Sequence, residues 1–157
     1  MAVKNAAAKE LREIKLVNKN TSLNLLKENS VKPSSAKDNQ ITYPDGISYF
    51  VRVSAFDDDK RIDKKNNYLL PGSYTTTKKD YEKCVNDKDD PVQRYSLPNE
   101  EIIKWAFHIL PEKQDGYRFG TVQPQFNKRG GGEECYFENG TSFGTFKKQT
   151  DYGVFYP

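Results

Sequence analysis

From Tyr43 onward, short β-prone runs alternate with turn signals, and this pattern limits the fold more than any other feature of the chain. Pro44-Asp45-Gly46 and Asn139-Gly140 are turn signals, and three consecutive glycines follow residue 129. Runs of this length between glycine and proline turns are typical of antiparallel sheets. The predicted strands cover residues 47–53, 74–77, 105–110, 117–122, 134–137 and 142–146.

One helix is predicted within this β-rich part. Residues 78–84 follow Thr77, whose hydroxyl can cap a helix, and Asp80 and Glu82 lie in the first turn, where acidic side chains favour the helix dipole. The expected fold class is therefore α+β, with a mainly antiparallel β core and one or two short helices.

The first forty residues have a different texture. Residues 18–40 are rich in Asn, Ser and Lys, which is typical of a linker or tail. Before them, residues 2–17 carry apolar side chains every three or four positions, which predicts an amphipathic helix: Val3, Ala7, Leu11, Ile14 and Val17. We therefore expect a helix and linker over residues 1–42 and one domain over residues 43–157.

Composition excludes several classes of protein. No run of about 20 apolar residues exists, so no membrane-spanning helix is expected. The net charge of +3 lacks the excess of basic residues typical of nucleic-acid binders. The N-terminus has no continuous apolar run, so we expect either a cytosolic protein or delivery by a route without a cleaved signal peptide.

The chain has too few Cys and His residues for a zinc site. Cys84 and Cys135 are far apart in the sequence, and His108 is the single histidine, whereas a structural zinc ion takes about four ligands. Two cysteines are also few for a disulfide scaffold, so free thiols are expected. Because His108 lies in an apolar run, a structural role is favoured over that of a catalytic base.

Two segments offer ligand-binding side chains. Arg52 lies within an apolar strand, where its guanidinium is a rigid fork for a pyrophosphate or carboxylate, or else faces solvent. In the segment 68–77, Tyr68 or Tyr74 can stack on a ring and a threonine hydroxyl can orient neighbouring side chains. A plain turn followed by a strand explains this second segment equally well.

A third segment combines glycines with carboxylates. Gly130-Gly131-Gly132 is costly in backbone entropy and is easier to explain where the backbone passes close to a ligand. Glu133 and Glu134 follow within a strand, where neighbours point to opposite faces, so one of them should face inward. A surface turn is the alternative.

The order of these segments resembles a known family. Leu70-Pro71-Gly72, the segment 94–98, the segment 120–126 and Gly130-Gly131-Gly132-x-Glu134 together look like the tuberculosis necrotizing toxin domain. They are also similar to related C-terminal toxin modules of RHS and YD-repeat proteins. The resemblance covers roughly residues 52–137.

The resemblance implies an ADP-ribosyltransferase-like core that binds NAD+ as substrate, without a metal, and breaks its nicotinamide–ribose bond. It makes Glu134 and Arg52 the catalytic residues, the arginine holding the pyrophosphate and the glutamate contacting the ribose. The implied substrate-binding residues are Tyr68, Tyr74, Thr75, Phe126 and Gly131. It further implies a secreted or delivered toxin that acts in the target cytosol and is neutralised by a cognate immunity protein in its producer.

The sequence departs from the family in ways that leave the acceptor open. The necrotizing-toxin pattern has glutamine where Glu134 falls, whereas protein-modifying transferases have glutamate together with a second Glu or Gln two residues earlier, where this chain has Gly132. We therefore expect an NAD+ glycohydrolase, with a mono-ADP-ribosyltransferase acting on a target macromolecule as the alternative. A ribonuclease using Lys128, Arg129 and His108, and a non-catalytic β-rich binding module, remain further alternatives.

Overall fold

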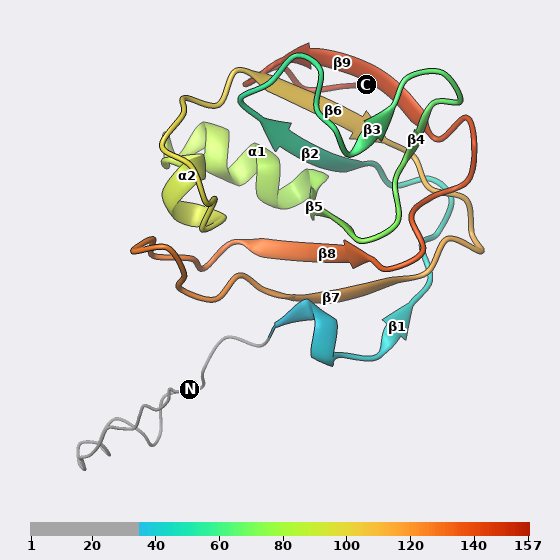
Figure 1. Ribbon diagram of the computed structural model, residues 1–157, viewed down its shortest axis with the longest axis horizontal. Helices are drawn as coiled ribbons and strands as arrows, with labels where there is room; N and C mark the ends of the chain where they lie inside the picture. Colours follow the sequence, from blue (N-terminus) through green and yellow to red (C-terminus); the bar gives the residue numbers. More distant parts are fainter. Residues whose placement is uncertain (1–34) are drawn as a thin grey trace. The chain divides into compact units, whose positions relative to one another are not determined.

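Seven strands form an antiparallel sheet in the spatial order β1-β7-β8-β5-β2-β6-β9 (Figure 1). The structure is a computed structural model and describes residues 35–157. The strands are β1 (Ile41–Thr42), β2 (Phe50–Ser54), β5 (Ser73–Thr77), β6 (Trp105–Ile109), β7 (Tyr117–Thr121), β8 (Glu133–Phe137) and β9 (Phe146–Asp151). The predicted mainly antiparallel β architecture with short helices is confirmed.

The central strand β5 divides its hydrogen bonding between two neighbours. Its residues 73–75 pair with β8, whereas Thr76 and Thr77 pair with Val51 and Phe50 of β2. The sheet therefore forks beyond Thr75: β8 and β7 continue on one side, and β2, β6 and β9 on the other (Figure 1). This fork is the feature that positions the site described below.

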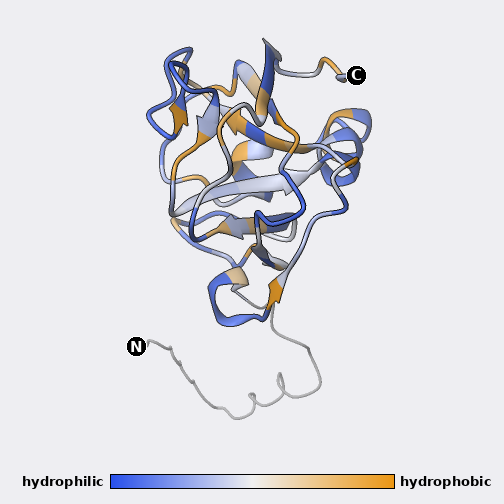
Figure 2. Ribbon diagram, turned by 90° about the vertical axis from the view of Figure 1, so that its right-hand side faces the viewer, coloured by the Kyte–Doolittle hydropathy of each residue, from blue (hydrophilic) through white to orange (hydrophobic). Residues whose placement is uncertain are grey.

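The two arms of the fork enclose the main hydrophobic core. Phe50, Phe107 and Ile109 of β2 and β6 pack with Cys135 and Phe137 of β8, and all five are at most 4% exposed. Phe107 and Ile109, and likewise Cys135 and Phe137, are two positions apart along their strands and so face the same side of the sheet. Figure 2 shows the resulting interleaving of apolar and polar residues along the strands.

The predicted helix is confirmed as α1 (Lys78–Asn86). As expected, the hydroxyl of Thr77 caps it, accepting a hydrogen bond from the backbone N–H of Asp80 at 3.0 Å. The helix packs Tyr81 against Val51 and Ala106 on the face of the sheet opposite the main core. The remaining elements are α2 (Pro91–Arg94), the hairpin of β3 (Ile62–Asp63) and β4 (Tyr68–Leu69), and the short 3-10 helix η1 (Ala36–Asp38).

The prediction of a strand over residues 142–146 is wrong, because the polar side chains of this segment form hydrogen bonds that turn the chain. Ser142 donates from its backbone N and its Oγ to the carboxylate of Asp115, at 3.0 and 2.7 Å. Thr145 Oγ1 in turn donates to the carbonyl of Ser142 at 2.7 Å. These bonds fold the segment into a turn, and the strand begins only at Phe146.

The folded unit begins earlier than the sequence analysis placed it. Within the described residues it already includes residues 36–42, which therefore belong to it rather than to a tail. Ile41 and Thr42 pair with β7, and Ala36 is fully buried. The helix predicted over residues 2–17 lies outside the described residues. Both cysteines are free thiols, as expected, and both are buried.

Candidate functional site

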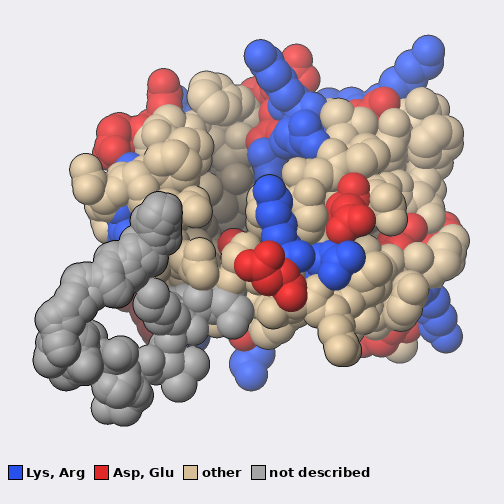
Figure 3. Space-filling model, turned by 60° about the horizontal axis from the view of Figure 1, so that its bottom comes forward, with Lys and Arg blue, Asp and Glu red and all other residues tan. Residues whose placement is uncertain are grey.

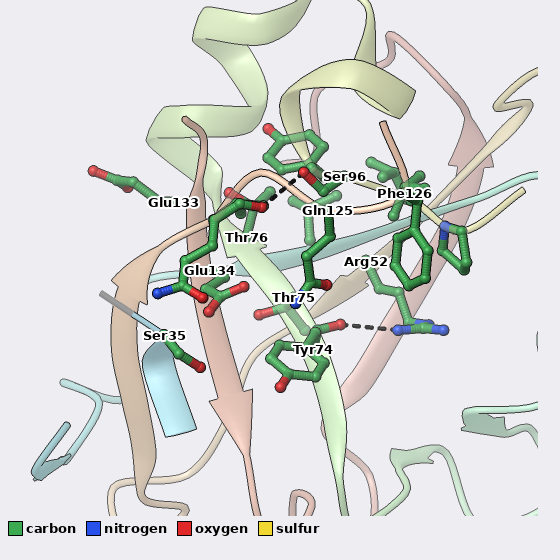
Figure 4. A pocket seen from close by; sticks show the side chains of 17 residues that line it. Ser35, Arg52, Tyr74, Thr75, Thr76, Ser96, Gln125, Phe126, Glu133 and Glu134 are labelled. Atoms are coloured by element: carbon green, nitrogen blue, oxygen red, sulfur yellow. Dashed lines mark hydrogen bonds between the residues drawn. The ribbon is translucent and has the colours of Figure 1, made fainter. Parts of the chain in front are cut away.

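A cavity of about 390 Å³ opens where β5 leaves β8 for β2 (Figure 4). Its walls come from residues 51–53 of β2, residues 74–76 of β5, and Glu133 and Glu134 of β8. The loops 95–98 and 122–126, together with Ser35, complete the lining. Because the sheet forks here, backbone and side chains from three strands meet in one hollow.

Five of the seven predicted site residues line this cavity: Arg52, Tyr74, Thr75, Phe126 and Glu134. Figure 4 shows Arg52 and Phe126 toward one end of the view, with Glu134 and Ser35 toward the other. Residues that are up to 82 positions apart in the sequence are therefore brought to the same pocket.

Arg52 is held in place by two partners. Its Nε donates to Oδ1 of Asp59 at 3.0 Å, and its Nη1 donates to the carbonyl of Tyr74 at 3.0 Å. Asp59 is only 6% exposed, which makes this a substantially buried ion pair. Within residues 35–157, Nη2 has no hydrogen-bond partner, so this edge of the guanidinium can still bind an anionic ligand.

Glu134 is half-buried and carries one backbone hydrogen bond. Its Oε2 accepts from the N–H of Ala36 at 2.8 Å. Burial raises the pKa of the Glu134 carboxyl, although the Ala36 N–H and the charge of Lys37 oppose the rise. Burial and the charge of Glu134 also raise the pKa of Tyr74 to about 12, so this phenol is neutral beside the carboxyl. A carboxyl with a raised pKa is suited to accept a proton.

Glu133 has a different role from its neighbour. Its Oε1 accepts a hydrogen bond from Thr77 Oγ1 at 2.6 Å, and its backbone N donates to Asp80 at 3.2 Å. Figure 4 shows its side chain directed away from Glu134. Glu133 therefore ties β8 to the start of α1, and Glu134 is the carboxylate available to a ligand.

Thr75 presents a buried hydroxyl in the same cavity. Thr75 is paired with Cys135 in the antiparallel ladder between β5 and β8. Its Oγ1 is buried and has no hydrogen-bond partner of normal length within residues 35–157. Buried polar atoms in folded proteins are almost always paired, so an exception at a cavity wall is a candidate ligand contact.

Tyr68 lies away from the cavity, whereas Tyr74 of the same segment lines it. It belongs to β4, and its ring packs on Phe143 with centroids 4.7 Å apart. The first residues of the segment 68–77 form a small hairpin outside the main sheet, and only its later residues reach the pocket.

The glycine triplet does not line the cavity, and two of its three residues pack closely against protein. A Cβ on Gly130 would lie 2.6 Å from the carbonyl oxygen of Val122, and one on Gly132 would lie 2.6 Å from the Tyr95 ring. Gly131 is exposed, with φ at 103°, and is absent from the cavity wall. The glycines do allow a close approach of the backbone, as expected. The approach is between the β7–β8 connection and the loop after α2, that is, between two parts of the protein.

The loops over the cavity contain two strained residues that sequence reasoning missed or left unexplained. Ser96 and Phe126 have φ values of 47° and 54°, which non-glycine residues seldom adopt. Ser96 Oγ donates to the carbonyl of Gln123 at 2.9 Å and joins the two loops. Phe126 is 56% exposed. Strained backbone of this kind gathers at functional sites, and no sequence motif marks Ser96.

A buried ion pair supports these loops from behind. Asp80 accepts hydrogen bonds from Arg94 Nη2 at 2.5 Å and from Tyr95 Oη at 2.9 Å. Burial alone would raise the pKa of the Asp80 carboxyl, but these two donors lower it. Arg94 also binds Asp89 at 3.0 Å. The network fixes the start of loop 95–98 relative to α1.

His108 has the structural role that the sequence favoured. It is 1% exposed, lies outside the cavity, and its Nε2 is 2.8 Å from Thr150 Oγ1. Burial lowers its pKa to about 4, so the ring is neutral at pH 7.

Comparisons with known proteins found no matching family model, no matching curated protein and no matching solved structure. Within residues 35–157, no group of three or more His, Cys, Asp or Glu side chains is arranged to hold a metal ion. The same residues include no helix of the length and apolarity needed to cross a membrane.

Proposed function

We propose that this protein cleaves NAD+ at the nicotinamide–ribose bond, as an NAD+ glycohydrolase built on an ADP-ribosyltransferase-like core. One observation carries the proposal: Arg52 of β2, Tyr74 and Thr75 of β5, and Glu134 of β8 line one cavity. These residues were assigned from the order of motifs along the chain, and three separate strands contribute them.

The chemistry requires stabilisation of a cation. When the bond from the ribose C1′ to the nicotinamide nitrogen breaks, its electron pair leaves with nicotinamide, and the ribose becomes oxocarbenium-like. Glu134 supplies a negative oxygen beside this developing charge. A water molecule then forms the new C1′–O bond, and Glu134, whose pKa is raised by burial, accepts its proton.

The other lining residues hold the substrate. The unpartnered edge of Arg52 binds a pyrophosphate oxygen, and the ring of Tyr74 packs on the nicotinamide. Arg52 cannot swing away freely, because Asp59 and the Tyr74 carbonyl fix its guanidinium. Fixed charges of this kind lower the entropy that is lost on reaching the transition state.

A mono-ADP-ribosyltransferase is the second candidate, supported by the carboxylate at position 134. A carboxylate can deprotonate an acceptor hydroxyl or thiol of a target macromolecule as well as water. Protein-modifying transferases have glutamate at this place, whereas the necrotizing-toxin pattern has glutamine. Delivery into a target cytosol and a cognate immunity protein belong to the same proposal and rest on the resemblance alone.

The ribonuclease alternative loses support from the contacts of its three residues. Lys128 is 5% exposed and its Nζ binds Glu100 at 2.6 Å. Arg129 binds Asp89 at 2.7 Å, and His108 is buried elsewhere. Figure 3 shows a band of Lys and Arg down the middle of the face that it presents, with Asp and Glu beside it. The remaining alternative is a non-catalytic binding module, and the nicotinamide-release experiment described next tests it as well.

The decisive experiment measures nicotinamide release from NAD+ by the full chain. Release is expected for the unchanged protein, and Glu134→Ala should reduce it by a factor of 100 or more, on the order of removing a transition-state charge contact. Glu138→Ala is the matched control, because Glu138 is exposed, follows the same strand and lies outside the cavity. If nicotinamide is released only with a cell lysate that becomes labelled from tagged NAD+, the transferase is correct. If neither occurs, the proposed function is wrong.

A further inference from the structure

A second hollow lies on the other side of Arg52. Its volume is about 840 Å³, and it is lined by the loop 55–61 together with Lys104 and Trp105. Arg52 is the one residue that lines both this hollow and the cavity at the fork. The residue that the proposed function assigns to the pyrophosphate therefore contributes to both hollows.

The walls of the second hollow carry side chains without partners. Phe56 is 51% exposed and packs against no other ring within residues 35–157. In the same part of the chain, the carboxylate of Asp58, the indole N–H of Trp105 and the ammonium group of Lys104 make no hydrogen bond or ion pair. The hollow thus offers an aromatic face, an acceptor and donors at once.

This set of groups suits a nucleoside diphosphate. An exposed aromatic ring can stack on a base. A carboxylate accepts hydrogen bonds from the vicinal hydroxyls of a ribose, and lysine and arginine bind phosphate oxygens. Of the three carboxylates in the lining, that of Asp59 is neutralised by Arg52 and that of Asp57 accepts a hydrogen bond from Gln149 at 2.6 Å, which leaves Asp58 as the acceptor for a ligand.

We infer that the hollow lined by Phe56, Asp58 and Lys104 binds the adenosine diphosphate half of the substrate, with Arg52 between the two halves. The inference rests on the proposed function for the identity of the dinucleotide. Phe56 packs on the adenine, Asp58 accepts from the ribose hydroxyls, and Lys104 faces the phosphates. The nicotinamide riboside half then occupies the cavity at the fork.

Direct binding of ADP to the full chain, measured by isothermal titration calorimetry, tests this site without requiring turnover. Phe56→Ala should weaken ADP binding at least about fivefold, the lower end expected for loss of one base stack. Phe143→Ala is the matched control, because Phe143 is 65% exposed and lies outside both hollows. The control should bind ADP like the unchanged protein.

Asp58→Asn separates ribose recognition from general charge effects. It should weaken binding of ADP more than binding of the 2′,3′-dideoxy analogue, which lacks the hydroxyls. In turnover, Phe56→Ala should lower the preference for NAD+ over nicotinamide mononucleotide, measured as the ratio of kcat/KM values.

The outcomes distinguish this site from the proposed activity. If NAD+ is cleaved but ADP affinity is the same in Phe56→Ala as in Phe143→Ala, the second site is wrong and the activity stands. If ADP binding depends on Phe56 and Asp58 while NAD+ is not cleaved, the nucleotide site stands and the proposed function fails. Absence of ADP binding at millimolar concentration overturns the inference.

Discussion

The carboxylate of Glu134 accepts a hydrogen bond from the backbone N–H of Ala36, which lies 98 residues earlier in the chain, at 2.8 Å. Ala36 is fully buried, and the same short helix places Lys37 Nζ 5.5 Å from the centroid of the Tyr136 ring. A segment that the sequence assigned to a tail therefore contacts the carboxylate at the centre of the proposed site.

This contact predicts how the titration of Glu134 responds to Ala36→Pro. Proline has no N–H, and the extended backbone of Ser35, with ψ at 134°, accepts a following proline. Removing a hydrogen bond to the charged form disfavours that form, so the pKa of Glu134 should rise further. Carbon-13 NMR of the carboxyl measures the shift, and Ala36→Gly, which retains the N–H, is the control. An unchanged pKa in the proline variant would contradict this assignment.

Loss of the Asp80 carboxylate should destabilise the fold strongly. Asp80→Asn removes the negative charge that Asp80 places beside the guanidinium of Arg94. Breaking a buried ion pair costs about 3–5 kcal/mol of folding free energy. Urea denaturation measures the change in the free energy of unfolding. Asp87→Asn is the comparison, because Asp87 forms an exposed pair with Lys83 that contributes at most about 1 kcal/mol. Equal effects of the two substitutions would refute the bracing role of Asp80.

His108 should make the fold less stable in mild acid. Its pKa is lowered from 6.5 to about 4 by burial, so between these values the unfolded chain binds more protons than the folded one. The free energy of unfolding should then fall by about 3 kcal/mol as the pH drops from 6.5 to 4, and be fully retained above 6.5. Denaturation at several pH values measures the slope, which His108→Gln should flatten. A slope that is identical in the variant would assign the pH dependence to other groups.

The two tyrosines that the sequence treated as interchangeable should behave differently. Tyr74 lines the cavity, whereas Tyr68 packs on Phe143 in the outer hairpin. Tyr74→Ala should reduce nicotinamide release about tenfold, because an aromatic contact contributes up to about 1.5 kcal/mol. Tyr68→Ala should leave it within twofold of the unchanged protein. Thermal unfolding of both variants separates loss of function from loss of fold, and a larger effect at Tyr68 would overturn the site.

Local sequence determined those elements whose signals lie within a few residues. The helix 78–86 was predictable because Thr77 caps it directly. The strands near residues 50 and 107 were predictable because each is a short, nearly continuous apolar run rich in aromatic and β-branched residues. The structural role of His108 followed from its apolar neighbours. The turn at 142–145 escaped prediction, because the hydroxyl of Ser142 binds Asp115, which is 27 residues away.

Tertiary structure alone decided the composition of the site. No local pattern states that β5 leaves β8 at Thr76, yet this fork brings Arg52 and Glu134 to one cavity. The glycines of the triplet were noticed for their freedom, but only packing against Tyr95 shows what they contact. Strand formation depends on neighbours along the chain, whereas a pocket depends on which distant strands pair. For this reason the sequence determined most of the strands and the candidate residues, and the structure decided which of them meet.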